Sequence, residues 1–548
     1  MLSCTPRVIR RLSAGTSRSL AALALSALCL LAAACGGGSS TSSSTTSPGN
    51  SGRLGPSSMF TPSNAQLNNN PAAALDELKR LGIDTVHVYM HWADIAPSAS
   101  SAKRPSFDAA NPAAYPASGW AIYDTIIRDT QARGMKVLLD LVSPPPNWAS
   151  GPGAPHPASQ PFWRPSPQQF ALFTRAVGKR YSGHFTPPGS SSPLPRVNFW
   201  SIWNEPNLGI ELAPQTVPHS YVEISGSLYR GLVDAAWGAL QASGHGRDTI
   251  LIGEIAPAGA TFGYAPGLFA AMAPLRFLRA LYCVDGSYHP LTGKAAKARG
   301  CPTTAAGTKA FAAQHPGLFQ ASGFADHPYS QGLAPNQPTP NEPDYAELAD
   351  LPRLEHALDT LQSVYGSHTR FPIYSTEYGY QTTPPDTEAG TVSPAQAAVF
   401  LNWSEYITWL NPRLRSYDQY LMTDSSAGNF ATGLRFPNGS EKPSYAAFRM
   451  PLYLPKTTGA KGQALEVWGC VRPAPAVQAS GHRRQQARIQ FAPASGGAFT
   501  TLRAVPLAGP RCYFDVQQRF PASGRVRLAW AYPHGPTVFS RIVDITLR

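Results

Sequence analysis

The 548-residue sequence lacks long blocks of basic residues, nucleic-acid-binding motifs and internal repeats. Charged residues make up only 14% of it, yet the formal net charge is +13, because 45 lysines and arginines outnumber 32 aspartates and glutamates. A positive charge scattered in this way favours anionic surfaces or polymers without naming one. We therefore expect no nucleic-acid partner, and the missing repeats exclude a solenoid.

The sequence has few apolar runs near membrane-spanning length, and the main one lies at the N-terminus. SLAALALSALCLLAAA follows a basic start and ends in small residues, which is typical of a secretion signal. LAAAC resembles a bacterial lipobox, in which Cys35 would be lipidated, although Ala32 stands where leucine is commonest. Cleavage by ordinary signal peptidase after the alanine run is the alternative. We expect a signal over 1–34, a Ser/Thr/Gly-rich tether over 35–54, and an extracytoplasmic protein that is lipid-anchored or secreted.

Cysteine is scarce: the chain has seven, and three of them lie in or directly after the signal. Cys283, Cys301, Cys470 and Cys512 remain. Disulfides are expected outside the cytoplasm, and four cysteines allow three pairings. We favour Cys283 with Cys301 and Cys470 with Cys512, because each pair closes a loop within one expected domain. Free buried thiols are the alternative.

From residue 55 to 450, strand-like apolar runs alternate with helical segments. Seven runs read as strands, and a weaker eighth, SSMFTP, precedes them. Several of the helical segments begin after Asn, Ser or Pro and end at Gly, as helix caps predict. Eight strand–helix units indicate a (β/α)8 (TIM) barrel, an α/β fold. A doubly wound open sheet is the competitor, but no Gly-rich phosphate loop follows an early strand.

Residues 451–548 follow a different pattern, with short alternating runs separated by turn residues and no long helical period. This pattern predicts an all-β, immunoglobulin-like sandwich domain. Such a domain binds carbohydrate or packs against the barrel to stabilise it, and the sequence leaves both roles open.

Two expected barrel strands end in a glutamate. NFWSIWNEP places Asn204 and Glu205 behind a buried run, and IYSTEYGY places Glu377 behind another. With SSMFTP as the first strand, these are the fourth and seventh strands, whose carboxyl ends form the catalytic rim of such barrels. Two carboxyl groups facing each other across a cleft suit cleavage of a glycosidic bond, where one donates a proton and the other attacks.

WNEP after the fourth strand, with a second glutamate after the seventh, resembles the clan A glycoside hydrolases, the retaining barrel enzymes that include families 5 and 39. The likeness covers most of residues 55–450 and extends to the SPPPNWA loop and to GFADHPY. It implies that Glu205 is the general acid/base and Glu377 the nucleophile. It also implies that Asn204 binds a sugar hydroxyl, and that His327 and Tyr329 support the nucleophile and line the sugar site.

The sequence departs from the pattern in two places. The second strand, VHVYMHW, offers no arginine of the kind that many family 5 enzymes have there, and the eighth strand ends without tryptophan. Trp148, in the loop after the third strand, is the best candidate for stacking on a sugar. Glu254 ends the fifth strand, where it is either a partner of the catalytic groups or a structural carboxylate.

His87 and His91 are four residues apart, a zinc spacing on a helix, but this segment alternates as a strand, and no third ligand group accompanies them. We therefore expect no metal and no cofactor. We expect a monomeric glycosidase that hydrolyses an oligo- or polysaccharide and whose membrane contact is limited to the lipid anchor. The retaining mechanism and the β linkage are what the resemblance to clan A implies. The alternatives are a noncatalytic carbohydrate-binding surface lipoprotein on the same scaffold and a transglycosylase of envelope glycans.

Overall fold

The computed structural model describes residues 54–548 except 156, 218, 263–269, 482–483 and 508–509. The predicted signal and Cys35 lie outside the described residues, as does nearly all of the tether. Within the described part, no helix combines the length and apolarity needed to cross a bilayer.

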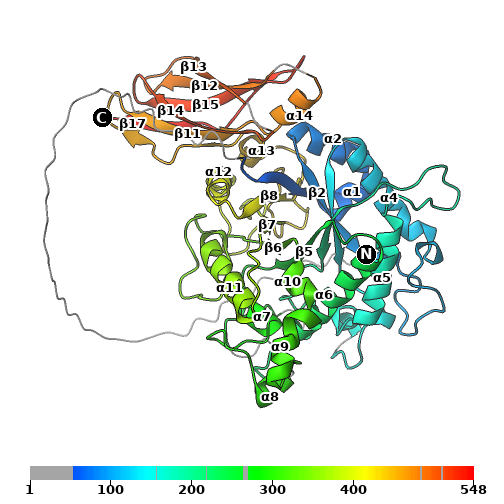
Figure 1. The fold of residues 1–548 in the computed structure, drawn as a ribbon. Helices are drawn as coiled ribbons and strands as arrows, with labels where there is room; N and C mark the ends of the chain where they lie inside the picture. The colour runs from blue at the N-terminus through cyan, green and yellow to red at the C-terminus, as the bar shows by residue number, and fades with distance from the viewer. Residues whose placement is uncertain (1–53, 156, 218, 263–269, 482–483, 508–509) are drawn as a thin grey trace, which may run out of the picture.

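Eight parallel strands close into a barrel, which confirms the predicted (β/α)8 architecture (Figure 1). The weak run SSMFTP is the first strand, and it closes the barrel by pairing with the eighth from Ser57↔Ser416 to Thr61↔Tyr420. The barrel strands are β1 (Ser57–Thr61), β2 (Thr85–His91), β3 (Lys136–Val142), β4 (Phe199–Ile202), β5 (Thr249–Ile255), β6 (Gly323–Asp326), β7 (Ile373–Ser375) and β8 (Leu414–Tyr420).

Helices cover the outside of the barrel, and several begin at proline behind a polar cap. Ser166 caps α5 and Ser393 caps α12, while α2 ends at Gly82 in a left-handed conformation, φ 82°. The longer helices are α2 (Pro71–Leu81), α4 (Ala117–Ala132), α5 (Pro167–Arg180), α6 (Ser225–Ala242), α7 (Pro274–Leu281), α9 (Ala305–Gln314), α11 (Leu351–Val364) and α12 (Pro394–Leu410). The shorter ones are α1 (Asn64–Asn69), α3 (Trp92–Ile95), α8 (Gly293–Ala298), α10 (Pro316–Gln320) and α13 (Pro443–Arg449), with 3₁₀ turns η1 (Pro112–Ala114), η2 (Asn147–Ala149), η3 (Pro157–Phe162) and η4 (Leu348–Asp350).

The barrel strands are buried on both faces, as expected for parallel strands covered by helices. In the segment between β5 and β6, Cys283 is disulfide-bonded to Cys301, which confirms that pairing. This bond joins the residues that follow α7 to those that follow α8 and so closes the loop between them.

The C-terminal part has its own hydrophobic core and two sheets. One sheet has the order β14-β11-β9, and the other β10-β17-β15-β12-β13 with β16 beside β15. The predicted C-terminal β sheets are therefore present, with one short helix among them, while the immunoglobulin-like classification stays a prediction. Its elements are β9 (Leu452–Tyr453), β10 (Thr458–Gly459), β11 (Ala464–Cys470), α14 (Ala474–Ala479), β12 (Gln486–Pro493), β13 (Thr500–Pro506), β14 (Tyr513–Arg519), β15 (Gly524–Ala531), β16 (Thr537–Phe539) and β17 (Val543–Leu547).

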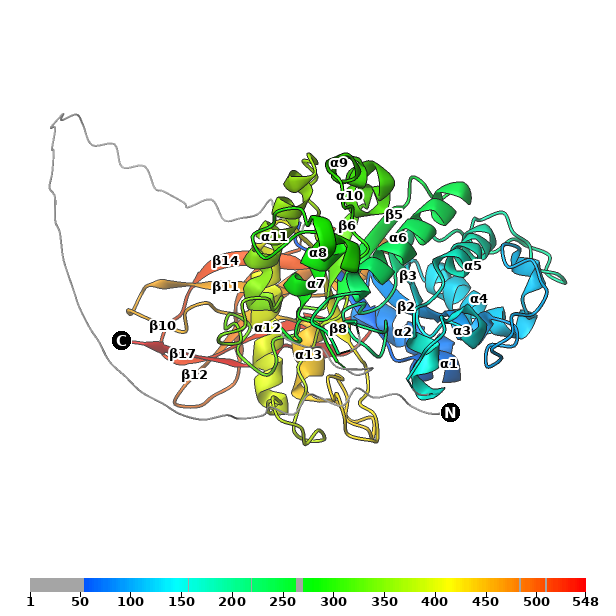
Figure 2. The ribbon, with the colours of Figure 1, turned by 90° about the horizontal axis from the view of Figure 1, so that it is seen from below.

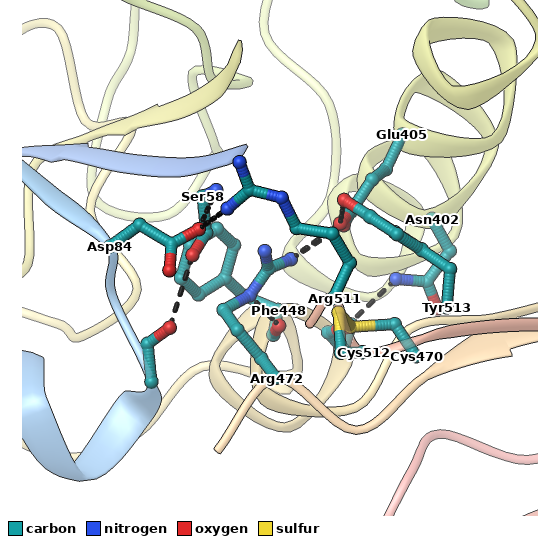
Figure 3. Close-up of a disulfide and its surroundings, with 12 residues drawn as sticks. Ser58, Asp84, Asn402, Glu405, Phe448, Cys470, Arg472, Arg511, Cys512 and Tyr513 are labelled. Carbon is teal, nitrogen blue, oxygen red and sulfur yellow. Dashed lines mark hydrogen bonds and ion pairs between the residues drawn. A yellow bond between two sulfur atoms is a disulfide. The ribbon is translucent and has the colours of Figure 1, made fainter. Parts of the chain in front are cut away.

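The C-terminal sheets lie on one flank of the barrel, beside α12 (Figure 2). At this contact the buried guanidinium of Arg472 donates to both carboxylate oxygens of Glu405 on α12, at 2.7 and 2.6 Å, and Tyr513 donates to the same carboxylate (Figure 3). The Cys470–Cys512 disulfide, also as predicted, joins the neighbouring strands β11 and β14.

Further contacts come from the amino edge of the barrel. Arg511 pairs with Asp84, directly before β2, and the hydroxyl of Tyr532 donates to the carbonyl oxygen of Arg80. Gly55 packs so closely that a Cβ atom there would lie 2.5 Å from the ring of Tyr513. The C-terminal domain thus docks away from the carboxyl ends of the strands.

Candidate active site

Glu205 stands three residues beyond β4, at the carboxyl edge of the barrel. All four residues of β4 are buried, and the chain then adopts left-handed conformations at Trp203, φ 67°, and Glu205, φ 39°. The backbone N–H of Glu205 donates to the carbonyl oxygen of Glu254 at 2.8 Å. Left-handed backbone is unfavourable for residues other than glycine and gathers at functional sites. The unusual backbone turns the Glu205 carboxyl toward the barrel mouth.

Glu377 lies two residues beyond β7, and two tyrosines hold its carboxylate. The hydroxyl of Tyr89, on β2, donates to Oε1, and that of Tyr329, beyond β6, donates to Oε2 at 2.8 Å. Burial, followed by the charge of Glu377, raises the pKa of both tyrosines well above the ordinary value. Both hydroxyls therefore remain neutral and donate hydrogen bonds to the Glu377 carboxyl oxygens.

His327, the residue after β6, connects the two glutamates. Its Nδ1 lies 2.9 Å from Oε1 of Glu205 and 3.6 Å from Oε2 of Glu377. Burial alone would lower its pKa, but the charge of Glu377 and the contacts with Glu205 and Glu254 raise it well above the ordinary value. This direction favours a protonated His327 beside the carboxyl groups.

The carboxyl groups of Glu205 and Glu377 approach each other closely. One oxygen of each and a nitrogen of His327 all lie within 4.8 Å of one another. Side-chain exposure is 17% for Glu205 and 8% for Glu377, so the mouth leaves more of Glu205 open. Burial raises the pKa of Glu205, and the hydrogen bond and charge of His327 offset only part of that effect. The pair can thus combine a proton donor with an ionised neighbour.

Glu254 lies fully buried behind this pair. It accepts hydrogen bonds from His327 Nε2 at 2.9 Å and from the hydroxyls of Ser201 and Thr376. Burial opposes its ionisation, but the hydrogen bond from His327 and the charges of His87 and His327 outweigh burial and lower its pKa. Of the two interpretations of Glu254 left open by the sequence, the contacts favour a partner of the site.

A second buried group adjoins Glu254 inside the barrel. Nε2 of His87 lies 3.7 Å from Oδ2 of Asp140, and these two side chains with Glu254 have ligand atoms within 4.8 Å of one another. Burial is the main cause that raises the pKa of Asp140, to about 6. Glu205, His327 and Glu377 form the other cluster of this spacing among the described residues, but both ring nitrogens of His327 already contact carboxyl oxygens. His91 belongs to neither group, since its ring contacts Asn64 and the carbonyl of Ser143.

Asn204 and Trp148 differ in their placement. Oδ1 of Asn204, directly before Glu205, is buried and has no hydrogen-bond partner within the described chain. Trp148 is 9% exposed, donates its indole N–H to Pro97, and packs edge to face against Trp92 and Phe107. The structure thus brings Asn204, His327 and Tyr329 to the two glutamates, but it leaves little of the Trp148 ring for a sugar.

Several residues of the site were not expected. Tyr89 shares a strand face with His87, which the alternation of VHVYMHW predicts, but nothing in the sequence pairs it with Glu377. Glu211, in the loop after β4, accepts a hydrogen bond from Ser143 at the end of β3. Burial raises its pKa to about 8, and the charges of Glu205 and Glu377 add to that effect. Glu211 is therefore another carboxyl group near the pair, besides Glu254, and it lies in a loop without a strand signal.

Comparisons with known proteins found no matching family model and no matching curated protein. Solved structures of glycosidases share the general fold. A family 39 glycoside hydrolase from Bacteroides cellulosilyticus WH2 has a TM-score of 0.44 and 13% identity over 85% of this chain and 80% of its own. A glucosidase from Croceicoccus marinus has a TM-score of 0.44 and 12% identity, with 84% and 82% covered.

An endo-β-1,4-mannanase from Thermotoga petrophila is similar over 90% of this chain and 98% of its own, with a TM-score of 0.36 and 12% identity. These likenesses are too distant to assign an activity. A functional conclusion therefore has to rest on the geometry of the residues at the carboxyl edge of the barrel.

Proposed function

We propose that this protein is a retaining glycoside hydrolase that cleaves β-linked oligo- or polysaccharides. The close approach of Glu205 and Glu377 carries the proposal. Carboxyl groups about 5 to 5.5 Å apart suit retention through a covalent glycosyl-enzyme, whereas inversion needs about 6.5 to 9.5 Å to admit water between them. One carboxyl oxygen of Glu205 and one of Glu377 lie within 4.8 Å of each other, and this short separation supports the retaining reaction. The β linkage follows from the resemblance to clan A.

In the first step Glu377 attacks the anomeric carbon while Glu205 gives its proton to the departing oxygen. The glycosidic bond breaks, and an ester bond to Glu377 forms. In the second step Glu205, now ionised, takes a proton from water, whose oxygen attacks the anomeric carbon and releases Glu377. The reaction consumes one water and leaves both glutamates as they began.

The surroundings of the two glutamates support this division of roles. The raised pKa of Glu205, the more exposed group, favours its role as the proton donor, while two tyrosine hydroxyls donate hydrogen bonds to Glu377. Oδ1 of Asn204 is buried and has no hydrogen-bond partner among the described residues, so it is available to accept a hydrogen bond from a sugar hydroxyl. The sugar identity is left open by these contacts.

A 2-deoxy-2-fluoroglycoside tests the proposal, because it traps the ester and marks the nucleophile. Screening a panel of such β-glycosides, followed by peptide mass spectrometry, should place the label on Glu377. The Glu377→Gly variant should lose activity by at least about 10³-fold and regain turnover with azide, giving a glycosyl azide of inverted configuration. Labelling of another residue would refute the mechanism, and sugar binding without turnover across the panel would favour the noncatalytic alternative.

We further propose that the protein is exported and anchored through Cys35, with the immunoglobulin-like domain stabilising the barrel. Two disulfides suit an extracytoplasmic location. The docking of the C-terminal sheets on the amino edge, away from the glutamates, supports a packing role over delivery of substrate. Mass spectrometry of the mature N-terminus would identify a lipidated Cys35, and a free N-terminus elsewhere would exclude it.

A further inference from the structure

We propose that Glu254 is a positioning residue: its buried carboxylate keeps His327 as an imidazolium, which fixes Oε1 of Glu205 and leaves Oε2 to carry the catalytic proton. The catalytic part of this inference rests on the proposed function. Its electrostatic part rests on the contacts of three side chains alone.

The hydrogen bonds around His327 require an additional proton. Both ring nitrogens lie 2.9 Å from a carboxyl oxygen, Nδ1 from Glu205 and Nε2 from Glu254. A neutral imidazole has one N–H and can satisfy only one of these contacts as a donor. Either the ring is protonated, or one of the two carboxyl groups donates a proton to it.

The surroundings of Glu254 decide between these two states. Its carboxylate is fully buried, and its neighbours are the hydroxyls of Ser201 and Thr376 and the ring of His327. Both hydroxyls are placed to donate, so a proton on Glu254 itself would compete with them. An ionised Glu254 satisfies all three contacts, and a buried ionised carboxylate needs a nearby positive charge. His327 supplies that charge.

The backbone conformation around Glu254 positions its carboxylate against the ring of His327. The β5–β6 ladder pairs Gly253 with Ala325 and Ile255 with Asp326, so Glu254 is the extra residue of a β-bulge, with a left-handed φ of 46°. Bulges re-aim side chains and gather beside active sites. A Cβ atom at Gly253 would lie 2.5 Å from the carbonyl oxygen of Ala325, so that position accepts only glycine. The bulge directs Glu254 into the barrel beneath His327.

The consequence for Glu205 follows from its two oxygens. Oε1 accepts from the imidazolium and cannot at the same time offer a proton in that direction. The proton of the acid form therefore sits on Oε2, which the His327 contact leaves for the substrate. A neutral ring would reverse this arrangement, because its bare Nδ1 would accept the proton of Glu205 and turn it away from the leaving group.

Other charges act on the same ring. Glu377 faces Nδ1 from β7, Asp326 precedes His327 on β6, and the pair His87 and Asp140 adjoins Glu254 from β2 and β3. The tyrosines on Glu377 are neutral. Glu254 is distinguished from these groups by its direct contact with Nε2.

Nitrogen NMR of histidine-labelled full-length protein tests the protonation directly. The His327 signals among the 13 histidines are those lost in His327→Gln. We expect two protonated ring nitrogens at pH 7 and above in the wild type, and loss of one proton within the neutral range in Glu254→Gln. One bare nitrogen at pH 7 in the wild type, or an unchanged titration in the variant, would overturn the proposal. The wild-type measurement decides the question even if Glu254→Gln does not fold.

Kinetics test the catalytic part. Glu254→Gln should lower kcat/KM by on the order of 10²-fold for aryl glycosides with poor leaving groups, but by less than about tenfold for dinitrophenyl glycosides, which need little acid assistance. Glu254→Asp, which keeps the charge, should recover part of the loss. Equal losses on both substrates would contradict positioning of Glu205.

Glu347→Gln is the matched control, since Glu347 is also fully buried and accepts two hydrogen bonds from Thr339, at 2.8 and 2.6 Å. Both readouts should be unchanged in it. If the wild type turns over no glycoside, the proposed function fails, while the NMR result still confirms or refutes the electrostatic part.

Discussion

Glu205 and Glu254 are joined through their backbones, the N–H of Glu205 donating to the carbonyl oxygen of Glu254 at 2.8 Å. Both residues have left-handed backbone, φ 39° and 46°, and both side chains contact His327. The strained turns after β4 and in β5 therefore support each other. We expect the site to respond to substitutions as one unit, with losses that are not additive.

Removal of the proposed acid should produce a loss that depends on the leaving group. Glu205→Ala should lower kcat/KM by about 10² to 10⁴-fold for phenyl glycosides, because the departing phenolate lacks a proton, and much less for dinitrophenyl glycosides. Added azide should give a glycosyl azide of retained configuration, because it attacks the ester on Glu377. Steady-state rates and product analysis check both outcomes, and a uniform loss without azide product would contradict the role of Glu205.

Removal of one hydroxyl should weaken the nucleophile. Tyr329→Phe deletes the 2.8 Å hydrogen bond to Oε2 of Glu377, and hydrogen bonds to charged groups contribute about 1.5 to 3 kcal/mol. We expect kcat/KM to fall by about 10- to 100-fold. The control is Tyr380→Phe, whose hydroxyl donates to the carbonyl oxygen of Leu333 instead, at 3.0 Å. Equal effects in both variants would indicate a packing role for Tyr329.

Glu211 should make stability depend on pH. Burial raises its pKa to about 8 in the folded chain, so between its unfolded pKa and pH 8 the folded state retains a proton that the unfolded state has released. Stability contributed by this group is therefore present at low pH and is lost as pH rises toward 8.

Glu211→Gln cannot ionise, so its stability relative to wild type should increase from pH 5 to pH 8.5, as measured by urea unfolding at both values. Glu388→Gln, at an exposed position, should show no such change. A difference between Glu211→Gln and wild type that is constant with pH would refute the shift.

The buried pair between the domains should be costly to break. Arg472→Met leaves the Glu405 carboxylate buried without its cation, which typically destabilises by about 3 to 5 kcal/mol. Replacing both residues, with Leu at 405 and Met at 472, should recover most of that loss. Arg370→Met, which breaks the more exposed pair with Asp359, should cost about 1 kcal/mol or less. Denaturant titration measures all three, and an equal cost for the single and double variants would contradict this account.

Much of the barrel could be predicted from periodicity, because buried parallel strands read as apolar runs and helix starts carry proline behind a polar cap. The weak run SSMFTP was predicted as a strand because a closed barrel needs eight strands, and the structure confirms it as β1. The positions of Glu205 and Glu377 at the carboxyl edge followed from strand order alone. The local sequence was sufficient to predict the position of a residue where that position depended only on the strand that contains it.

The rest depends on register and long-range contact, which no local pattern encodes. The bulge at Glu254 is a property of the β5–β6 pairing, so IGEIAP alone could not show where its carboxylate points. Tyr89 meets Glu377 across 288 residues of sequence. Trp148 was expected at the cleft because it follows β3, but its proline-rich loop folds back so that the ring packs against Trp92.

The described chain enters the fold at the C-terminal sheets. Gly55 lies against Tyr513 at the docking contact, two residues before β1 begins. If the Ser/Thr/Gly-rich residues 35–54 act as the tether that their composition predicts, these 20 residues would span roughly 25 Å on average. A lipid on Cys35 would then keep the amino edge of the barrel and the C-terminal sheets nearer to the membrane than the edge that carries Glu205 and Glu377.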